Sequence, residues 1–253
     1  MNSKQIIYFL LACFTLLITK SAFALPKGFV YLQDAIPTIK QDMRYVGDHN
    51  FIGRPLKGYK AGQCILTREA AEALAYAQTE LAQSGLSLKV YDCYRPKMAV
   101  DDIMQWSKQE KLQMMKAEFY PNINKADFFK LGYVVEKSGH CRGSTVDLTI
   151  VPIATPAQPE YHSGDKLVAC FASYQKRYRD NSIDMGTGFD CMDPASHPTS
   201  QSINSTAYQH RMLLRSVMIR HGFAPIEEEW WHFTLKQEPY PTTYFNFPVV
   251  SKT

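Results

Sequence analysis

The sequence predicts an α+β fold: a single domain in which helices flank a central, mostly antiparallel sheet. Segments with the helical and the strand period of apolar residues alternate along the chain, but without a strict strand–helix–strand rhythm. The sequence contains no glycine-rich phosphate loop, and no linker-like or low-complexity stretch divides residues 25–253. The first two observations argue against a doubly wound parallel sheet, and the third indicates one domain.

The composition is that of a globular protein with a sizeable core. Of the 253 residues, 45% are hydrophobic and 21% are charged, which excludes a disordered chain and a protein with many membrane spans. The formal net charge of +4 is small and evenly spread, so we expect no nucleic-acid partner. The oligomeric state is not specified by any pattern in the sequence.

Residues 1–24 have the pattern of a secretory signal peptide. Lys4 precedes the apolar stretch from Ile6 to Ile18, and the small–x–small motif of Ala22 to Ala24 follows it. The apolar stretch is shorter than the about 20 residues that a membrane-spanning helix needs. We therefore expect cleavage after Ala24, export to the periplasm and no stable membrane insertion afterwards. The alternative is an uncleaved membrane anchor.

Two helices and a strand are predicted in the first half of the mature chain. Thr67 can cap a helix that Gly85 ends, because apolar residues recur between them at helical spacing. Leu86–Tyr94 alternates as a strand. Pro96 is suited to the start of a second helix, whose apolar side is formed by Ala99, Val100, Ile103, Met104 and Trp106.

The second half combines strands, one long helix and a long irregular segment. Ser144–Ile150 alternates cleanly, with Val146, Leu148 and Ile150 on one face and Thr145, Asp147 and Thr149 on the other. Residues 153–183 are polar with few apolar anchors, so we expect a surface excursion. Strands are expected between Phe223 and Leu235. Before them, Ser205 can cap a helix that Gly222 ends, with Met212, Leu213, Val217 and Met218 inside.

Five cysteines remain after removal of the signal peptide, and an odd number leaves at least one without an intramolecular partner. No two of them form a CxxC pair, which argues against a cysteine-based zinc site. We predict the disulfides Cys93–Cys141 and Cys170–Cys191, with Cys64 unpaired and buried. The alternative is five unpaired cysteines, because cysteine is often a small buried residue.

The sharpest chemical signal is the block from Ser138 to Asp147, with the sequence SGHCRGSTVD. A neutral imidazole and a carboxylate are standard zinc ligands. Asp147 lies on the polar face of a predicted strand, and the glycine-flanked turn before it can fold His140 back towards that face. Alone the pattern is weak, and its alternative is a surface turn followed by an acid at a strand end.

A second signal is the sequence EEEWWHF at residues 227–233. An aromatic wall beside Glu229 would raise the pKa of its carboxyl towards the range of a general base. His232 would complete a His/Asp/His set that leaves a fourth zinc position open. Because Glu229 and His232 are three residues apart, the site needs a bend, or Glu229 must lie just outside the strand. The alternative is a buried tryptophan pair with a core histidine.

The third signal is the sequence YDCYRP, which places Arg95 between a predicted strand and a predicted helix. An arginine there can project into a cleft and stabilise developing negative charge. The alternative is a salt bridge to Asp92 or another acid. The other histidines lack a comparable setting and are expected to be surface or structural residues: His49, His162, His197, His210 and His221.

Together and in this order, the three motifs resemble the zinc-dependent D-alanyl-D-alanine dipeptidases of the VanX type. That family belongs to a wider group that shares a fold with lysostaphin-like enzymes and the hedgehog signalling domain. The resemblance covers nearly the whole mature chain. Besides the three motifs, it rests on Tyr45, Asn50–Pro55, Gly58-Tyr59, Tyr120–Asn122, Leu148-Thr149, Met185-Gly186, Phe189-Asp190, Glu238–Pro241 and Tyr244-Phe245.

The resemblance implies roles for eight residues. One zinc ion per chain would be held by His140, Asp147 and His232, and would lower the pKa of its bound water to about 7. Glu229 would be the general base and acid, and Arg95 would bind the tetrahedral intermediate. The substrate pocket would be lined by Tyr45, by Ser138 near the substrate carboxylate, and by Asp190, which is placed to receive a free amino group.

The resemblance further implies that residues 25–253 form a catalytic domain that hydrolyses D-alanyl-D-alanine to two D-alanines. Two alternatives stay open: a DD-carboxypeptidase or endopeptidase acting on peptidoglycan stem peptides, and a non-catalytic, zinc-stabilised wall-binding module. The excursion between Asp147 and Met185 is longer than is usual in the family, which keeps the first alternative open. The presence of Glu229 and Arg95 speaks against the second.

Two cysteines depart from the family pattern. Cys93 stands where the family commonly has glycine, and Cys141 stands where it commonly has serine. These substitutions indicate adaptation to an oxidising compartment.

Overall fold

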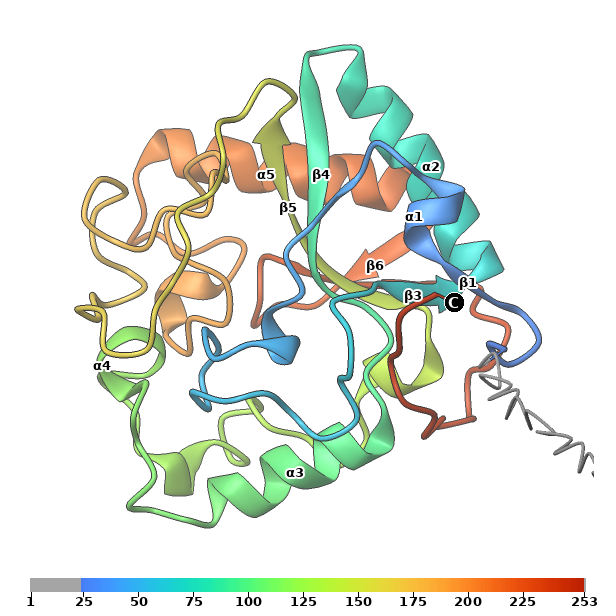
Figure 1. The fold of residues 1–253 in the computed structure, drawn as a ribbon. Helices are drawn as coiled ribbons and strands as arrows, with labels where there is room; N and C mark the ends of the chain where they lie inside the picture. Colours follow the sequence, from blue (N-terminus) through green and yellow to red (C-terminus); the bar gives the residue numbers. More distant parts are fainter. Residues whose placement is uncertain (1–23, 253) are drawn as a thin grey trace, which may run out of the picture.

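A five-stranded sheet forms the centre of the fold (Figure 1). The computed structural model describes residues 24–252. Its strands lie in the order β2 (Lys40–Gln41), β4 (Leu86–Asp92), β5 (Thr145–Pro152), β7 (His232–Leu235) and β6 (Phe223–Pro225). β2 pairs with β4 in parallel, and the other neighbours are antiparallel. A second, two-stranded sheet joins β1 (Phe29–Tyr31) to β3 (Ile65–Thr67). The predicted α+β fold with a mostly antiparallel sheet is confirmed.

The predicted signal peptide lies outside the described residues, apart from Ala24. Among the helices that the structure does describe, none is both long and apolar enough to cross a membrane.

Helices α2 (Arg68–Ala82) and α5 (Ser205–Arg220) are the long helices that support the sheet. α2 contacts β4, and α5 contacts both β6 and α2; Figure 1 shows α5 running behind β4 and β5. As predicted, the Thr67 hydroxyl caps α2 by accepting a hydrogen bond from the backbone N–H of Ala70. A main hydrophobic cluster fills the space between these two helices and the sheet.

The prediction for α5 is wrong in two details. Its cap is Asn204, whose side chain accepts the N–H of Ala207, and not Ser205. Leu214 is buried, whereas Leu213 is 37% exposed. The buried stripe includes Arg211, which donates to the carbonyls of Met185 and His197. A charged residue in a core position hides the true stripe from a hydrophobic pattern.

The remaining helices are short, except for α3 (Lys97–Ser107), which begins after Pro96 as predicted and runs along the lower edge of Figure 1. A second hydrophobic cluster, rich in aromatic residues, surrounds α3. The other helical segments are α1 (Leu32–Ala35), α4 (Lys116–Phe119), and the 3₁₀ turns η1 (Arg44–Val46), η2 (Lys125–Asp127), η3 (Gly139–Arg142) and η4 (Pro194–Ser196).

The excursion at residues 153–183 contains no helix or strand and lies at the left of Figure 1, away from α2. As the sequence indicated, it has few apolar anchors: Cys170 is buried, and Tyr161, Leu167, Phe171 and Ile183 are partly buried against the hydrophobic clusters. Ion pairs and hydrogen bonds also hold it in place. Asp180 is buried against Lys89 of β4 (3.4 Å) and Arg44 of η1 (3.3 Å), and it accepts a hydrogen bond from Tyr91. Asp42 completes this network of two cations and two carboxylates.

Asp180→Ala is expected to lower the free energy of unfolding by about 3–5 kcal/mol, because it leaves two buried cations with one carboxylate. Urea unfolding followed by tryptophan fluorescence measures this change. Asp165→Ala, on the same excursion but with a side chain that is 52% exposed, is the matched control, expected within about 0.5 kcal/mol of the wild type. Equal effects of the two substitutions would contradict a stabilising network.

The same network predicts loss of stability in acid. Burial alone would raise the pKa of Asp42 and of Asp180, but Lys89 and Arg44 lower both pKa values below the ordinary range. A carboxylate whose pKa is lower in the folded state stabilises the fold above its unfolded pKa of about 4 and loses that contribution as the pH falls. The stability difference between wild type and Asp180→Ala should therefore shrink below about pH 4.

The disulfide prediction is half right. Cys170–Cys191 is confirmed, whereas Cys93 pairs with Cys64 and not with Cys141. The N–H of Tyr94 donates to the carbonyl of Ile65 (2.9 Å), which brings the Cα atoms of Cys64 and Cys93 to 5.3 Å. Cys141 is buried in η3 and has no disulfide partner among the described residues.

Candidate active site

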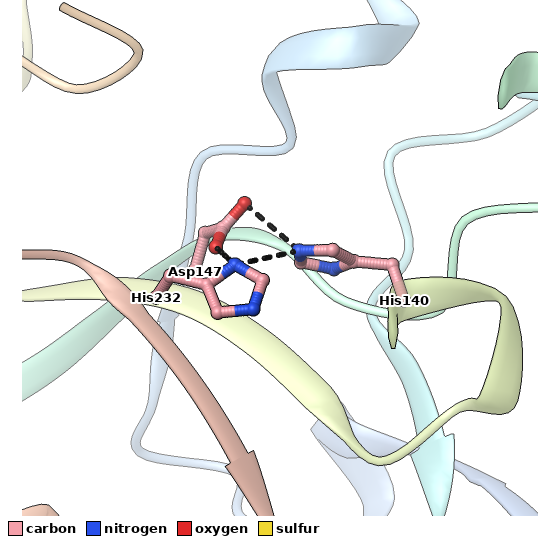
Figure 2. Close-up of side chains that lie close together, drawn as sticks. All are labelled: His140, Asp147 and His232. Atoms are coloured by element: carbon pink, nitrogen blue, oxygen red, sulfur yellow. Dashed lines mark hydrogen bonds and ion pairs between the residues drawn. The ribbon is translucent and has the colours of Figure 1, made fainter. Parts of the chain in front are cut away.

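Three predicted ligands converge at the centre of the sheet (Figure 2). The register of β5 and β7 sets Asp147 directly opposite His232. His140 reaches them from η3, which Gly143 ends with a φ of +80°. A Cβ at Gly143 would come within 2.2 Å of the Phe29 ring, so both the backbone conformation and the space there require glycine.

The spacing of these three groups fits a metal ion. Nε2 of His140 lies 3.3 Å from Oδ2 of Asp147 and 3.3 Å from Nδ1 of His232, and the latter lies 3.1 Å from Oδ1 of Asp147. In a tetrahedral zinc site with bonds of about 2.0–2.1 Å, ligand atoms lie about 3.3–3.4 Å apart. Oδ1 of Asp147 is buried and accepts no hydrogen bond of good geometry, as expected of an atom that faces a cation.

The surrounding groups prepare the ligands for a metal. Nδ1 of His140 lies 2.8 Å from the carbonyl oxygen of Cys93, so this nitrogen donates and leaves the lone pair of Nε2 for coordination. Burial would raise the pKa of Asp147, but His140 and His232 together lower it, which keeps the carboxylate ionised. The carboxylate of Asp147 is therefore in the form that binds a metal, and Nε2 of His140 is the ring nitrogen that faces it.

Glu229 lies in the turn that precedes β7, because the strand begins only at His232. Glu229 and His232 can therefore both face the site although they are three residues apart, because Glu229 lies just outside the strand. Oε2 of Glu229 lies 3.6 Å from Nδ1 of His232. The next residue, Trp230, is buried and donates its N–H to the carbonyl of Ser196 (3.1 Å) and its indole N–H to Thr187 (2.8 Å).

Burial raises the pKa of Glu229 to about 7, and the negative charge of Asp147 adds to this shift, although His232 and Arg95 oppose it. A pKa in this range suits a group that takes up and releases a proton near neutral pH. A cation bound at His232 would lower it again, so the carboxylate would be ionised and ready to accept a proton.

Arg95 forms the salt bridge to Asp92 and also lines the cavity. Its Nε donates to Asp92 (2.8 Å), while its Nη2 lies 3.7 Å from Oδ2 of Asp147 and its guanidinium lies over the ring of Tyr45. Asp92 is fully buried and also accepts a hydrogen bond from Tyr59 (2.6 Å). The sequence indicates Asp92 only as a salt-bridge partner, whereas in the structure it also holds the guanidinium at the site. Its position three residues before Arg95 was the available signal.

All eight predicted site residues line one cavity of about 180 Å³ between the two hydrophobic clusters: Tyr45, Arg95, Ser138, His140, Asp147, Asp190, Glu229 and His232. The structure thus brings together every residue that the sequence singled out, while their roles stay predictions. The five other histidines do not line it. His49 is buried by Tyr161 and Glu118, which makes it structural as expected.

Asp190 is the most unusual group in the cavity wall. It is 8% exposed, and one of its oxygens accepts a hydrogen bond from the Tyr45 hydroxyl (2.9 Å). Among residues 24–252, no lysine, arginine or histidine lies within ion-pair distance of this carboxylate. Burial, with Asp147 and Glu229 nearby, raises its pKa well above the ordinary value. Arg95 and the hydrogen bond from Tyr45 oppose this shift only in part. A cationic group of a ligand bound beside Asp190 would therefore stabilise the ionised form of this acid.

Three groups with the spacing of metal ligands line the same cavity as a glutamate and an arginine, which is the arrangement of a metal-dependent hydrolase. The chain belongs to the Peptidase_M15 family, described as D-ala-D-ala dipeptidase, whose model matches residues 26–154 and 152–250. The family indicated by the sequence resemblance is thereby confirmed.

Relatives from several bacteria bear the name D-alanyl-D-alanine dipeptidase. The one from Enterococcus faecalis (strain ATCC 700802 / V583) is 37% identical over 88% of this chain and 98% of its own length. The one from Streptomyces coelicolor is 38% identical over 87% and 98%, and the one from Escherichia coli K12 is 29% identical over 79% and 81%. A zinc complex of the vancomycin-resistance D,D-pentapeptidase VanY aligns with 72% of this chain and 78% of its own at 14% identity, with a TM-score of 0.37 that is too low to compare the folds.

Proposed function

We propose that this chain hydrolyses D-alanyl-D-alanine to two D-alanines. The observation that carries the proposal is Asp190, a buried carboxylate without a counter-cation in the same small cavity as the metal-ligand cluster. The cavity of about 180 Å³ is below the about 300–1,000 Å³ typical of sites for drug-sized ligands, which favours a small substrate. The names of the relatives agree with this substrate.

We infer that one zinc ion is held by His140, Asp147 and His232, whose spacing fits a tetrahedral site with one position left for water. Zinc at this position would supply a Lewis acid and lower the pKa of a bound water.

The side chains around these three residues transfer the proton, stabilise negative charge and bind the substrate. Glu229 takes a proton from the attacking water and delivers it to the amine of the leaving D-alanine. Arg95, held by Asp92 and the Tyr45 ring, stabilises the negative charge that develops on the carbonyl oxygen. Ser138 lines the cavity next to His140 and is assigned to the carboxylate of the substrate.

Asp190 decides between the dipeptide and longer peptides. A free dipeptide presents an ammonium group, which Asp190 and Tyr45 can bind as a charge-assisted hydrogen bond. In a peptidoglycan stem the same nitrogen is part of a neutral amide, which cannot form this ion pair with Asp190, and a substrate that lacks a group for which a buried polar partner is placed is strongly disfavoured. The structure thus favours the dipeptidase over the stem-peptide enzyme. The wall-binding module is disfavoured because a metal site needs neither Glu229 nor Arg95.

We also propose that the protein is exported and acts in the periplasm. The signal-peptide pattern of residues 1–24 supports this, and so do the two buried disulfides, since such bonds persist in oxidising compartments.

Asp190→Asn tests the assignment of the substrate end. We expect kcat/KM for D-alanyl-D-alanine to fall at least ~30-fold, because the ammonium loses its buried partner, which typically costs about 2–5 kcal/mol. The N-acetylated dipeptide lacks this ammonium, so its slow hydrolysis by the wild type should change little. Steady-state kinetics with both compounds measure the ratio. Equal losses for the two compounds, or no preference of the wild type, would contradict the proposed function.

A further inference from the structure

Each of the two disulfides has one cysteine next to a group of the candidate active site: Cys93 accepts a hydrogen bond from His140, and Cys191 follows Asp190. We propose that they are positioning elements: Cys64–Cys93 fixes the carbonyl that orients His140, and Cys170–Cys191 fixes the carboxylate of Asp190. The inference rests on the proposed function of these two residues. The Cys64–Cys93 crosslink does not follow from the family resemblance, because Cys93 stands where the family commonly has glycine.

The Cys170–Cys191 bond holds a part of the chain that has no regular structure. Asp190 directly precedes Cys191, and the stretch between β5 and η4 contains no helix or strand. Asp190 has a φ of 57°, in the left-handed region that residues other than glycine rarely adopt. Such a conformation persists only where the surrounding structure enforces it. The backbone at Asp190 therefore needs a specific restraint, and the adjacent disulfide supplies one.

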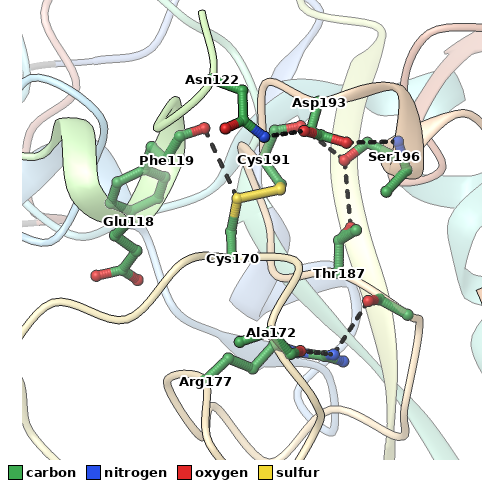
Figure 3. The surroundings of a disulfide bond; sticks show 12 residues. Glu118, Phe119, Asn122, Cys170, Ala172, Arg177, Thr187, Cys191, Asp193 and Ser196 are labelled. Carbon is green, nitrogen blue, oxygen red and sulfur yellow. Dashed lines mark hydrogen bonds between the residues drawn. A yellow bond between two sulfur atoms is a disulfide. The ribbon is translucent and has the colours of Figure 1, made fainter.

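Figure 3 shows how this disulfide is tied to α4. The N–H of Cys170 donates to the carbonyl of Glu118 (2.9 Å), and the N–H of Met192 donates to the carbonyl of Phe119 (2.8 Å). The two sides of the crosslink are thus attached to the same short helix. Ser196 adds a hydrogen bond to the carbonyl of Cys191 (2.6 Å). Together these contacts set the position from which the Asp190 side chain enters the cavity.

The Cys64–Cys93 bond acts on the metal side. β4 ends at Asp92, and its pairing with β5 is irregular between Val90 and Asp92, so the five-stranded sheet does not pair with the backbone at Cys93. The backbone next to it is held by the N–H of Tyr94, which donates to Ile65 of β3. Yet the carbonyl of Cys93 accepts the hydrogen bond that orients His140. Both cysteines are fully buried. The crosslink to Cys64, just before β3, fixes this carbonyl where the strand ends.

Removal of each disulfide is expected to impair a different property, zinc affinity or recognition of the free amino group. Each variant is therefore the matched control of the other. The experiment compares the zinc-loaded chain from residue 25 with the double variants Cys64→Ala/Cys93→Ala and Cys170→Ala/Cys191→Ala. Two quantities are measured: the zinc dissociation constant by chelator competition, and the ratio of kcat/KM for D-alanyl-D-alanine to that for its N-acetyl derivative. The ratio cancels any general loss of activity, which a merely structural role would cause. Thermal melting shows which variants are folded. An unfolded variant is replaced by Cys170→Val/Cys191→Ala or by Cys64→Val/Cys93→Ala, in which valine restores part of the lost side-chain volume.

Loss of Cys64–Cys93 is expected to weaken zinc binding about 10–100-fold, the usual effect of disturbing a group that orients a ligand, with little change in the ratio. Loss of Cys170–Cys191 is expected to lower the ratio of the two kcat/KM values by at least ~10-fold, because a displacement of about 1 Å at a reacting site can lower the rate ~100-fold. The zinc affinity of this variant should change little. Unchanged zinc affinity in the first folded variant, or an unchanged ratio in the second, overturns the inference.

The same assay separates this inference from the proposed function. If the wild type shows no preference for the free amino group, the proposed role of Asp190 is wrong. If the wild type shows the preference and Asp190→Asn loses it, but the folded Cys170→Ala/Cys191→Ala variant keeps it, the positioning role of the disulfide alone is refuted.

Discussion

Glu229→Gln in the zinc-loaded enzyme is expected to lower kcat for D-alanyl-D-alanine about 10²–10⁴-fold, the usual range for loss of a general acid–base group. The amide has nearly the same shape but cannot accept the proton of the attacking water. Because Glu229 lies beside His232 and is not one of the three closely spaced ligand groups, zinc content should stay near that of the wild type. Steady-state kinetics and metal analysis of the same sample measure both quantities.

The matched control for this substitution is Glu227→Gln. Glu227 lies two residues upstream in the same acidic run, but its side chain is 65% exposed and pairs with Arg215 at the surface. We expect kcat within about twofold of the wild type, because exposed ion pairs contribute little. If Glu229→Gln behaved like this control, the assignment of the proton-transferring group would be wrong.

His140→Ala has the second large expected effect, which is loss of zinc. Disturbing only a group that orients a ligand costs about 10–100-fold in metal affinity, so removal of the ligand itself should cost more than ~100-fold. Activity should fall with the zinc content, and added zinc should restore it only in part. Asp147→Ala and His232→Ala should behave in the same way, because the three groups lie at nearly equal distances from one another.

Chelator competition at buffered free zinc measures the affinity of each variant. His162→Ala is the control, since His162 is 71% exposed and lies outside the cavity. If all three ligand variants bound zinc as tightly as the wild type, the assignment of His140, Asp147 and His232 as zinc ligands would be wrong.

The parts of the site that the sequence predicted correctly are those that local patterns determine. Asp147 lies on the polar face of an alternating strand, and a short turn places His140 near it, so both follow from a segment of eight residues. His232 was linked to them through the resemblance and the sharp change in polarity at the tryptophans. The antiparallel register of β5 and β7 then sets it opposite Asp147.

The parts that were missed depend on contacts between distant segments. The Cys64–Cys93 pairing follows from a hydrogen bond between Tyr94 and Ile65, which no spacing of cysteines reveals. Asp180 is buried because Lys89 and Arg44 compensate its charge. A hydrophobic pattern assigns a charged residue of this kind to the surface, so the sequence predicts a surface excursion and does not reveal the ion pairs that hold it.

The most direct test of the central claim is D-alanine release by the mature protein from D-alanyl-D-alanine and from a stem pentapeptide, each with and without a chelator. The account predicts hydrolysis of the dipeptide that the chelator abolishes and zinc restores, with little release from the pentapeptide. Rapid release from the pentapeptide, or hydrolysis of the dipeptide that withstands the chelator, would contradict a zinc dipeptidase that recognises a free amino group through Asp190.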